Sequence, residues 1–253
     1  MLELAARPHQ RLARAESGTV TGPRPGLLAS VRSAEEALLA CVVPGQVALV
    51  DAKEPRHGAL GSLPSAVLHA IVQAVAGRAA VSATTGDLPL DAATLGPAMQ
   101  RVAACGVDFV KIGIFGAPDP AALARCLADL PPVKGRIAVL MADQGGAGWP
   151  LHLFAEHGFA GVMLDTAHKQ AGALPDLLTT DVLVDFVQRA RALGLLCGLA
   201  GSLRLRDIAP LQAVQADYLG FRSALCGDAP RTATLQPQAL AAVAQAMASA
   251  QTC

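Results

Sequence analysis

Residues 47–61, VALVDAKEPRHGALG, contain the pattern that decides the fold of this 253-residue chain. A short run of apolar residues ends in Asp51 and Lys53, and a segment with proline and glycine follows it. A short run that is apolar almost throughout is typical of a parallel β-strand buried on both faces. The polar residues at its end are therefore expected at the carboxyl end of a buried strand.

Similar runs recur along the rest of the chain. They are LLASV at 27–31, AAVSATTG at 79–86, FVKIGIFG at 109–116, RIAVLMAD at 136–143, GVMLDTA at 161–167, GLLCGLAG at 194–201 and YLGFRSALC at 218–226. Between them lie longer Ala- and Leu-rich helical patterns, several of which begin with Ser, Asp or Thr and end near Gly. Eight strands alternating with helices favour an α/β fold of one domain, the closed (β/α)8 TIM barrel, over an open doubly wound sheet. The connection at 87–106 fits this pattern less well and leaves a smaller open α/β fold as the alternative.

The composition supports a large core and excludes several classes of partner. The chain is 53% hydrophobic and 16% charged, and no apolar stretch reaches the roughly 20 residues needed to cross a membrane. A formal net charge of zero and an isoelectric point near 7.0 argue against binding to nucleic acid or anionic lipid. Six scattered cysteines lack the spacing of a zinc site or a disulfide framework. We therefore expect no metal, and any bound anion must be held locally.

The two ends of the predicted barrel define the domain organisation. Residues 1–26 are expected to form an irregular N-terminal extension, and 27–253 the catalytic barrel. The extension contains Arg and Pro but lacks the apolar core of a secretory signal, so we expect a cytoplasmic protein. The Ala- and Leu-rich helices predicted around the barrel favour a homo-oligomer.

Lysine is scarce in this sequence, with four lysines against sixteen arginines. Lys53, Lys111 and Lys169 lie at the ends of predicted strands, whereas Lys134 lies in a predicted loop. Arginine can replace lysine wherever only a solvated charge is required, but it cannot act as a nucleophilic amine. The placement of the three lysines therefore indicates lysine chemistry. For any single lysine, an ion pair or a phosphate contact is the ordinary alternative.

Carboxylates accompany these lysines. Asp51 lies two residues before Lys53, so both side chains point to the same face of an extended strand, and Asp165 lies four residues before Lys169. Active sites of barrel enzymes lie at the C-terminal ends of the strands, where we expect these side chains to converge. The alternative is that the Asp–Lys pairs only stabilise strand ends. Two further acids are expected at the same rim, Asp87 and Asp143.

Small residues and an arginine follow the last two predicted strands. Gly201 and Ser202 lie in CGLAGSLRLRD, and Arg222 and Ser223 lie in GFRSALCGD. In this fold the loops after strands seven and eight commonly bind phosphate through backbone amides. These four residues are therefore the predicted phosphate site, although glycine also serves plain turns.

Together these motifs resemble a known family, the (5-formylfuran-3-yl)methyl phosphate synthases, also described as 4-(hydroxymethyl)-2-furancarboxaldehyde-phosphate synthases of methanofuran biosynthesis. The resemblance rests on VDAKEPRHGALG, SATTGDLP, DFVKIGIFG, MLDTAHK, LAGSL and GFRSALC, in that order, and covers roughly residues 27–226. Members of this family are (β/α)8 barrels that condense two molecules of glyceraldehyde 3-phosphate, with loss of one phosphate and two waters. The resemblance implies a carbon–oxygen lyase acting on phosphates that needs no cofactor.

The family's active-site residues match, motif by motif, Asp51, Lys53, Lys111, Asp165 and Lys169. We expect Lys53 to form a Schiff base with one triose phosphate and Asp51 to orient Lys53. Lys169 with Asp165 is expected to supply an acid and a base, and Lys111 to act on its neighbouring amine or hold a phosphate.

The chain also departs from the archaeal members of the family. The segments QGGAGWP at 144–150 and QAGAL at 170–174 differ from their equivalents, which leaves details of the substrate open. Two other functions remain possible on the residues alone. One is another lysine-dependent (class I) aldolase of sugar phosphates, and the other is a non-catalytic barrel that binds a phosphorylated metabolite.

Overall fold

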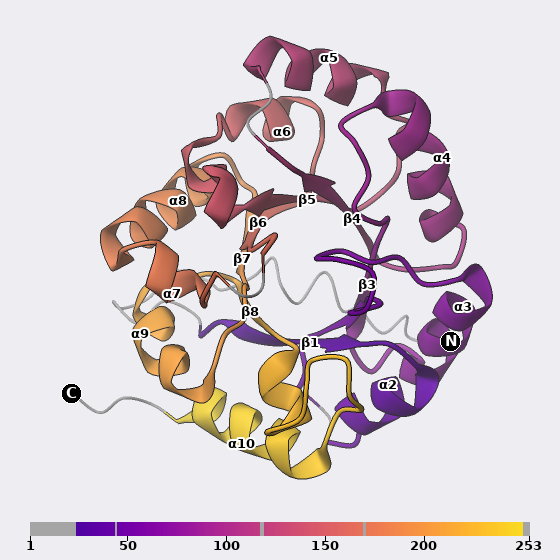
Figure 1. Cartoon of the computed structure of the whole chain (residues 1–253). Coiled ribbons are helices and arrows are strands. Elements are labelled where there is room, and N and C mark those ends of the chain that lie inside the picture. Colours follow the sequence, from indigo (N-terminus) through magenta and orange to yellow (C-terminus); the bar gives the residue numbers. More distant parts are fainter. Residues whose placement is uncertain (1–23, 44, 117–118, 169–170, 250–253) are drawn as a thin grey trace, which may run out of the picture.

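The eight apolar runs form a closed barrel in the computed structural model of the chain, which describes residues 24–43, 45–116, 119–168 and 171–249 (Figure 1). Each strand pairs in parallel with its neighbours in sequence, and β8 pairs with β1. The predicted (β/α)8 barrel is therefore confirmed, and the open sheet is excluded. The strands are β1 (Gly26–Val31), β2 (Leu49–Ala52), β3 (Ala80–Thr84), β4 (Phe109–Ile114), β5 (Arg136–Met141), β6 (Gly161–Asp165), β7 (Leu196–Leu199) and β8 (Tyr218–Phe221).

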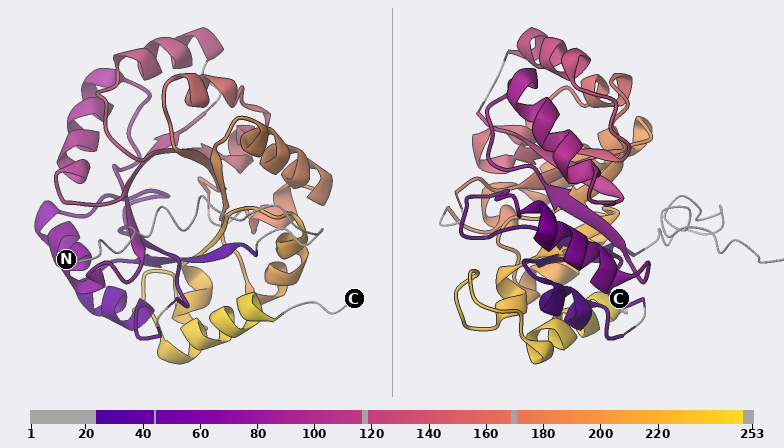
Figure 2. Two further views of the ribbon diagram at one scale, coloured as in Figure 1. Left: turned by 180° about the vertical axis from the view of Figure 1, so that it is seen from behind. Right: turned by 90° about the vertical axis from the view of Figure 1, so that its right-hand side faces the viewer.

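Helices surround the barrel on its outside, as the views from behind and from the side make clear (Figure 2). They are α2 (Ala34–Ala40), α3 (Ser65–Val75), α4 (Ala92–Ala103), α5 (Pro120–Asp129), α6 (His152–Glu156), α7 (Leu174–Leu177), α8 (Thr180–Ala192), α9 (Ile208–Ala213) and α10 (Pro237–Ala248). Short 3₁₀ turns lie in the loops that follow β5, β7 and β8. These are η1 (Ala142–Gln144), η2 (Gly146–Gly148), η3 (Leu205–Asp207) and η4 (Ser223–Cys226). Most of the predicted extension at 1–26 lies outside the described residues.

The third connection, which fitted the repeat less well in the sequence, contains the regular helix α4. Pro97 and Gly96 lie inside this helix and weaken its sequence pattern. Two features compensate for them. The Asp91 carboxylate accepts hydrogen bonds from the first backbone N–H groups, and Leu95 and Met99 are buried against the barrel.

The strands separate two hydrophobic regions. Outward-facing side chains such as Val50, Val81 and Ile112 pack against the helices in the larger core. Inward-facing side chains fill the lower part of the barrel, and this inner cluster includes Leu28, Leu49, Phe109, Ile137, Met163 and Tyr218. Above Leu28 and Leu49, two residues further along their strands, the inward positions become polar. The barrel interior is thus an apolar base beneath a polar mouth.

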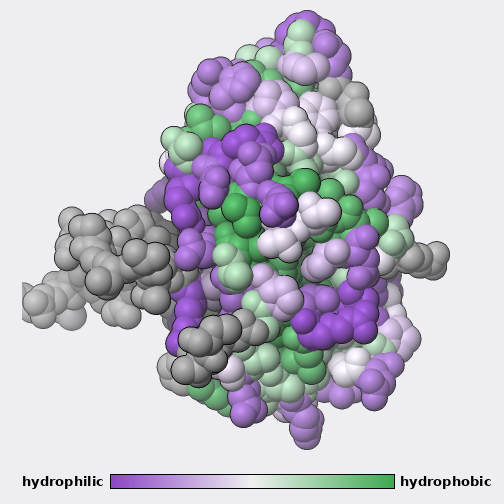
Figure 3. All heavy atoms as spheres, turned by 90° about the vertical axis from the view of Figure 1, so that its left-hand side faces the viewer, coloured by the Kyte–Doolittle hydropathy of each residue, from purple (hydrophilic) through white to green (hydrophobic). Residues whose placement is uncertain are grey.

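The outer surface carries few large apolar side chains that are exposed. Leu38, Val42 and Val43 lie in and after α2, and Val182, Leu193 and Leu205 lie in or near α8 and η3. On the side of the molecule formed by α7, α8 and α9, apolar side chains are interspersed with hydrophilic ones (Figure 3). None of the helices in the described part of the chain is both long and apolar enough to cross a membrane. The cysteines described are unpaired and buried.

Candidate active site

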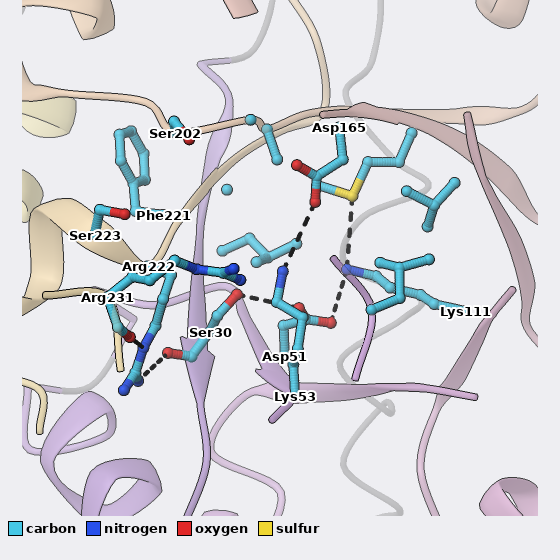
Figure 4. A pocket seen from close by; sticks show the side chains of 17 residues that line it. Ser30, Asp51, Lys53, Lys111, Asp165, Ser202, Phe221, Arg222, Ser223 and Arg231 are labelled. Carbon is cyan, nitrogen blue, oxygen red and sulfur yellow. Dashed lines mark hydrogen bonds and ion pairs between the residues drawn. The ribbon is translucent and has the colours of Figure 1, made fainter. Parts of the chain in front are cut away.

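Four charged side chains meet in one cavity at the C-terminal mouth of the barrel (Figure 4). Asp51 lies on β2 and Lys53 directly after it, Lys111 lies on β4, and Asp165 ends β6. All four are buried, with exposed fractions between 2% for Asp51 and 7% for Lys53. The structure thus brings together four of the five predicted catalytic residues, while Lys169 lies outside the described residues.

Asp51 is the centre of a hydrogen-bond network that crosses several strands. Its carboxylate accepts hydrogen bonds from Ser30 Oγ at 3.1 Å and from Ser82 Oγ at 2.6 Å. Both serines are register partners of Asp51, Ser30 on β1 and Ser82 on β3. Lys111 Nζ lies 2.8 Å from Asp51 Oδ1. Three neighbouring elements therefore hold this carboxylate in one orientation.

The protonation of this pair follows from burial and from the charges around it. Burial raises the pKa of the Asp51 carboxyl, but attraction to Lys111 and Lys53, with hydrogen bonds from Lys111 and Ser82, outweighs burial and leaves the pKa below its usual value. Burial lowers the pKa of the Lys111 amine, and the like charge of Lys53 adds to this effect against the attraction of Asp51. The site thus contains an ionised carboxylate beside a lysine that loses its proton more readily than an exposed lysine.

Lys53 pairs with a different carboxylate from the one expected. Its Nζ lies 3.7 Å from Asp165 Oδ2, whereas Asp51 pairs with Lys111. Residues two apart on a strand are separated by about 6.6 Å along it, so Asp51 is turned toward neighbouring strands rather than toward Lys53. The Asp165 carboxylate is also fixed from within its own loop, since it accepts a hydrogen bond from Thr166 N at 2.7 Å.

The two additional acids at the rim, Asp87 and Asp143, anchor loops. Asp87 accepts hydrogen bonds from the backbone N–H groups of Ala59 and Leu60 in the loop after β2. Asp143 accepts hydrogen bonds from the backbone N–H groups of Ala167 and His168, and lies 2.9 Å from His168 Nδ1. Neither carboxylate lines the cavity. Their role in the structure is to fix the loops that border the mouth.

Gly201, Ser202 and Ser223, three of the predicted phosphate residues, line the cavity on the side of β7 and β8. The backbone at Gly201 has a φ of +106°, and a Cβ there would lie 2.8 Å from Thr166 Cγ2, so both conformation and space require glycine. Ser202 has a φ of 51°, in the left-handed region that side chains rarely adopt. Strained backbone of this kind is concentrated at functional sites.

Arg222, the fourth predicted phosphate residue, also borders the cavity, but its guanidinium is directed away from it toward β1 and α2 (Figure 4). Two of its N–H groups bind the Glu36 carboxylate, with Nη1 at 2.6 Å and Nη2 at 3.2 Å. The others bind the backbone carbonyls of Ser30, Arg231 and Ala233. A guanidinium has five N–H donors, and protein acceptors occupy all of them here. This arrangement argues against a direct contact between Arg222 and a phosphate.

Sequence reasoning missed three polar residues of the cavity or its support. Ser30 and Ser82, which bind Asp51, are small hydroxyl residues at inward positions of buried strands, and that placement was the available signal. Arg231 lines the cavity from the loop between η4 and α10. It lies in RTATLQP, where no strand or helix pattern marks it. Within the described ranges, no group of three or more His, Cys, Asp or Glu residues is arranged to hold a metal ion.

Comparison with known proteins gives a consistent result over nearly the whole chain. The family model of 4-HFC-P synthase matches residues 27–244. The (5-formylfuran-3-yl)methyl phosphate synthase of Methanocaldococcus jannaschii is 32% identical in an alignment of 212 residues that covers 79% of this chain and 89% of that protein. The enzyme of the same name from Methanopyrus kandleri is 34% identical over 83% of this chain and 94% of its own length. A Methylorubrum extorquens protein that carries this name provisionally is 42% identical over 90% of this chain and 94% of its own.

Solved structures with the same fold are more distant in sequence. Phosphoribosyl anthranilate isomerase from Thermus thermophilus has a TM-score of 0.59 and 16% identity, covering 88% of this chain and 98% of that chain. A 3-hexulose-6-phosphate synthase has a TM-score of 0.58 and 20% identity, covering 88% of this chain and 100% of that chain. Identities this low establish the fold alone. The match at 27–244, by contrast, spans all the charged residues of the cavity.

Proposed function

The chain belongs to the 4-HFC-P synthase family, and from this premise we propose that it condenses two molecules of glyceraldehyde 3-phosphate into (5-formylfuran-3-yl)methyl phosphate for the biosynthesis of a methanofuran-type cofactor. One phosphate and two waters leave, and all six carbons of the two trioses are kept. The atoms balance without an oxidant or a reductant. In this proposal the enzyme is a carbon–oxygen lyase acting on phosphates.

The observation that carries this proposal is the pair of buried lysines at the mouth of the barrel. Lys53 and Lys111 both line the cavity, and each lies against a carboxylate, Asp165 and Asp51 respectively. Burying an ammonium is costly, so lysines retained in a buried cavity beside carboxylates are candidates for chemistry. Neutral amines attack aldehydes to form Schiff bases. The cavity therefore has the groups that a lysine-dependent condensation requires.

Lys53 is the nucleophile in this mechanism. Among the described residues its amine has a single ion pair, at 3.7 Å, whereas Lys111 is held at 2.8 Å by Asp51 and lies 3.6 Å from the Met163 sulfur. Lys53 attacks the aldehyde carbon of one triose phosphate, and water leaves as the Schiff base forms. The protonated nitrogen then acts as an electron sink while the adjacent carbon loses a proton. The resulting enamine attacks the aldehyde carbon of the second triose.

Lys111 and Asp51 act together as a proton-transfer pair. Asp51 is held in one orientation by Ser30 and Ser82, and it in turn fixes the Lys111 amine. Since burial lowers the pKa of Lys111, this amine gives a proton to a developing alkoxide more readily than an exposed lysine would. This role replaces the direct support of Lys53 by Asp51 that the sequence suggested.

Asp165, with Lys169, supplies the acid and base for isomerisation, elimination and ring closure. Asp165 Oδ2 lies 3.7 Å from the Lys53 amine, which places it to take a proton from the carbon next to a Schiff base on Lys53. The phosphate leaves by elimination from an enamine: the lysine nitrogen donates its electron pair, and the phosphate departs with the electron pair of the broken C–O bond. Hydrolysis of the last Schiff base takes up one water and frees the lysine. Backbone amides near Gly201, with Ser202 and Ser223, bind the phosphate that is retained.

Reductive trapping tests this proposal. The purified protein is incubated with glyceraldehyde 3-phosphate, reduced with borohydride and digested, and the modified peptide is located by mass spectrometry. We expect a reduced adduct on Lys53. An adduct on Lys169 would exchange the roles of the two lysines. A folded protein that binds the substrate and forms no adduct on any lysine would reject the mechanism in favour of a metabolite-binding barrel.

Product analysis separates the proposed reaction from that of another class I aldolase of sugar phosphates. Both enzymes would form the same adduct, but a furan aldehyde absorbs in the near ultraviolet and an aldol sugar does not. We expect an absorbing product with release of inorganic phosphate. A sugar phosphate formed without phosphate release would support the aldolase instead.

A further inference from the structure

Two arginines line the same cavity, and their surroundings differ. Arg222 comes directly after β8, and Arg231 lies nine residues further along in the loop that leads to α10. All five N–H groups of Arg222 are bound to protein acceptors. For the Arg231 guanidinium, the described residues provide one hydrogen bond, from Nη1 to the Gly58 carbonyl at 3.5 Å. That distance is at the outer limit for a hydrogen bond.

Arg222, whose N–H groups are all bound, holds the backbone of Arg231 in place. Arg222 Nε donates to the Arg231 carbonyl at 2.8 Å, and Arg222 Nη2 donates to the Ala233 carbonyl at 2.6 Å. A backbone hydrogen bond from Ala233 N to the Pro230 carbonyl at 2.7 Å closes the turn. Glu36, which is 2% exposed, binds Arg222 from the opposite side. The backbone of Arg231 is thus fixed by a buried ion pair rather than left as a free loop.

The side chain of Arg231 extends into the cavity. Its guanidinium lies toward Ser30 and Lys53, while that of Arg222 points away from the cavity (Figure 4). Burial lowers the pKa of Arg231, against attraction to Asp165 and Asp87. An arginine nevertheless stays protonated in proteins. Its charge is therefore partly withdrawn from water, without a salt bridge to any of the described carboxylates.

We propose that Arg231 binds the phosphate of the substrate, in the cavity that Ser202 and Ser223 also line. A guanidinium presents paired N–H groups that match the oxygens of a phosphate, and charged hydrogen bonds of this kind are the stronger ones. Arg222 is then the positioning residue that holds the Arg231 backbone. This inference rests on the proposed function, because it assumes a phosphorylated substrate whose aldehyde reaches Lys53.

The assignment also gives the cavity a polarity. Lysines and carboxylates from β2, β4 and β6 surround the aldehyde end, and Arg231 with the loops after β7 and β8 surrounds the phosphate end. A ligand with a phosphate therefore gains an interaction that its unphosphorylated counterpart lacks. The site is predicted to select phosphorylated trioses over free ones through Arg231.

Binding of an unreactive analogue tests this assignment independently of turnover. The probes are glycerol 3-phosphate and glycerol, measured by calorimetry on the full chain. We expect Arg231→Gln to weaken binding of glycerol 3-phosphate by roughly 10- to 100-fold, the range for one charged hydrogen-bonded contact. Arg231→Lys keeps the charge but loses the paired N–H groups, so its affinity for glycerol 3-phosphate should lie between those of the wild type and Arg231→Gln. Arg206→Gln serves as the matched control. Arg206 is an exposed arginine in the loop after β7, and its Nε lies 4.0 Å from the Asp207 carboxylate.

The possible results distinguish a failure of the phosphate role of Arg231 from a failure of the proposed reaction. If Arg231→Gln binds glycerol 3-phosphate as the wild type does, with an unchanged KM in turnover, the phosphate role of Arg231 is overturned and the proposed reaction stands. If the variant loses phosphate-dependent binding but the wild type makes no furan product, the phosphate role stands and the proposed reaction fails. A loss of binding equal to that of Arg206→Gln would indicate a general charge effect and overturn the assignment.

Discussion

Two buried groups of charge, one in the cavity and one reaching behind its wall, differ in how completely they are paired. Glu36 and Arg222 form an ion pair in which every guanidinium N–H has a protein acceptor. Lys53, by contrast, has one ion pair within the described part of the chain, at 3.7 Å to Asp165. Breaking a complete buried pair leaves a charge that nothing compensates, so such a pair is structural. A buried amine with a single loose partner remains available to a ligand, which makes it a candidate for chemistry.

The strongest test of this contrast is Lys53→Arg. The substitution keeps a positive charge beside Asp165 but removes the nucleophilic amine, so folding should be retained and turnover lost. Loss of a covalent catalyst is expected to cost on the order of 10⁴-fold in kcat, or about 5 kcal/mol. The measurement is the rate of furan product formation, with thermal unfolding monitored by circular dichroism.

Lys134→Arg is the matched control for this variant. Lys134 is an exposed lysine in the loop before β5, so the same exchange there should leave both turnover and unfolding unchanged. Substantial turnover by Lys53→Arg, under conditions where Lys134→Arg is fully active, would remove Lys53 from the role of nucleophile. The incomplete pairing of Lys53 would then not indicate a catalytic role.

Glu36→Gln tests the structural side of the contrast. The substitution leaves the buried Arg222 without its anionic partner, and breaking a buried pair in this way costs roughly 3–5 kcal/mol of unfolding free energy. Urea unfolding followed by circular dichroism measures the loss. Glu35→Gln is the control, because Glu35 is exposed one residue earlier in the same helix and should leave the unfolding midpoint unchanged. An equal midpoint for the two variants would show that the Glu36–Arg222 pair does not stabilise the fold.

Asp51→Asn tests the proton-transfer pair through the pH dependence of activity. The Asp51 carboxylate raises the pKa of Lys111 against burial and against the charge of Lys53. Its removal therefore moves that pKa further down, and the alkaline limb of kcat/KM, which requires protonated Lys111, should move to lower pH. We also expect a loss of roughly 10²-fold in rate, as for other acid–base groups. Ser82→Ala, which removes a neutral hydrogen bond to Asp51, should leave the limb in place; a shift as large in this control would assign the effect to packing.

Much of the fold could be predicted from the sequence because the signal repeats. Each parallel strand is buried on both faces and so appears as an apolar run, and eight such runs leave few alternatives to a barrel. The general position of the site follows as well, since Asp51 and Asp165 stand near the carboxyl ends of their runs. Lys111 was expected at a strand end but stands inside β4, and its side chain reaches the same cavity. The weak connection at 87–106 was uncertain only because Gly96 and Pro97 interrupt a helix that tertiary packing stabilises.

The partners within the site could not be predicted, because they depend on contacts distant in sequence. Arg222 and Arg231 are both arginines near the last strand, and the sequence does not distinguish them. Glu36, 186 residues before Arg222, decides which of the two guanidinium groups is occupied. Likewise, Asp51 pairs with Lys111 on β4 rather than with its near neighbour Lys53. The reason is that Asp51 and Lys53 lie at different depths along the direction of β2.

The smallest expected effect concerns Asp143, a carboxylate that borders the cavity without entering it. It accepts hydrogen bonds from the backbone N–H groups of Ala167 and His168, and its pKa is lowered because these bonds outweigh burial, which alone would raise it. Asp143→Asn retains one acceptor oxygen of two and should lower the unfolding free energy by about 1 kcal/mol near neutral pH. Asp129→Asn, at an exposed position at the end of α5, is the control.

A carboxyl group with a depressed pKa stabilises the fold above its ordinary pKa and ceases to do so as the pH falls through its lower folded-state value. The difference between wild type and Asp143→Asn should therefore narrow on acidification, as measured by urea unfolding across the acid range. A difference that is independent of pH would indicate that Asp143 acts through shape alone, and the loop after β6 would then be held by its backbone rather than by charge.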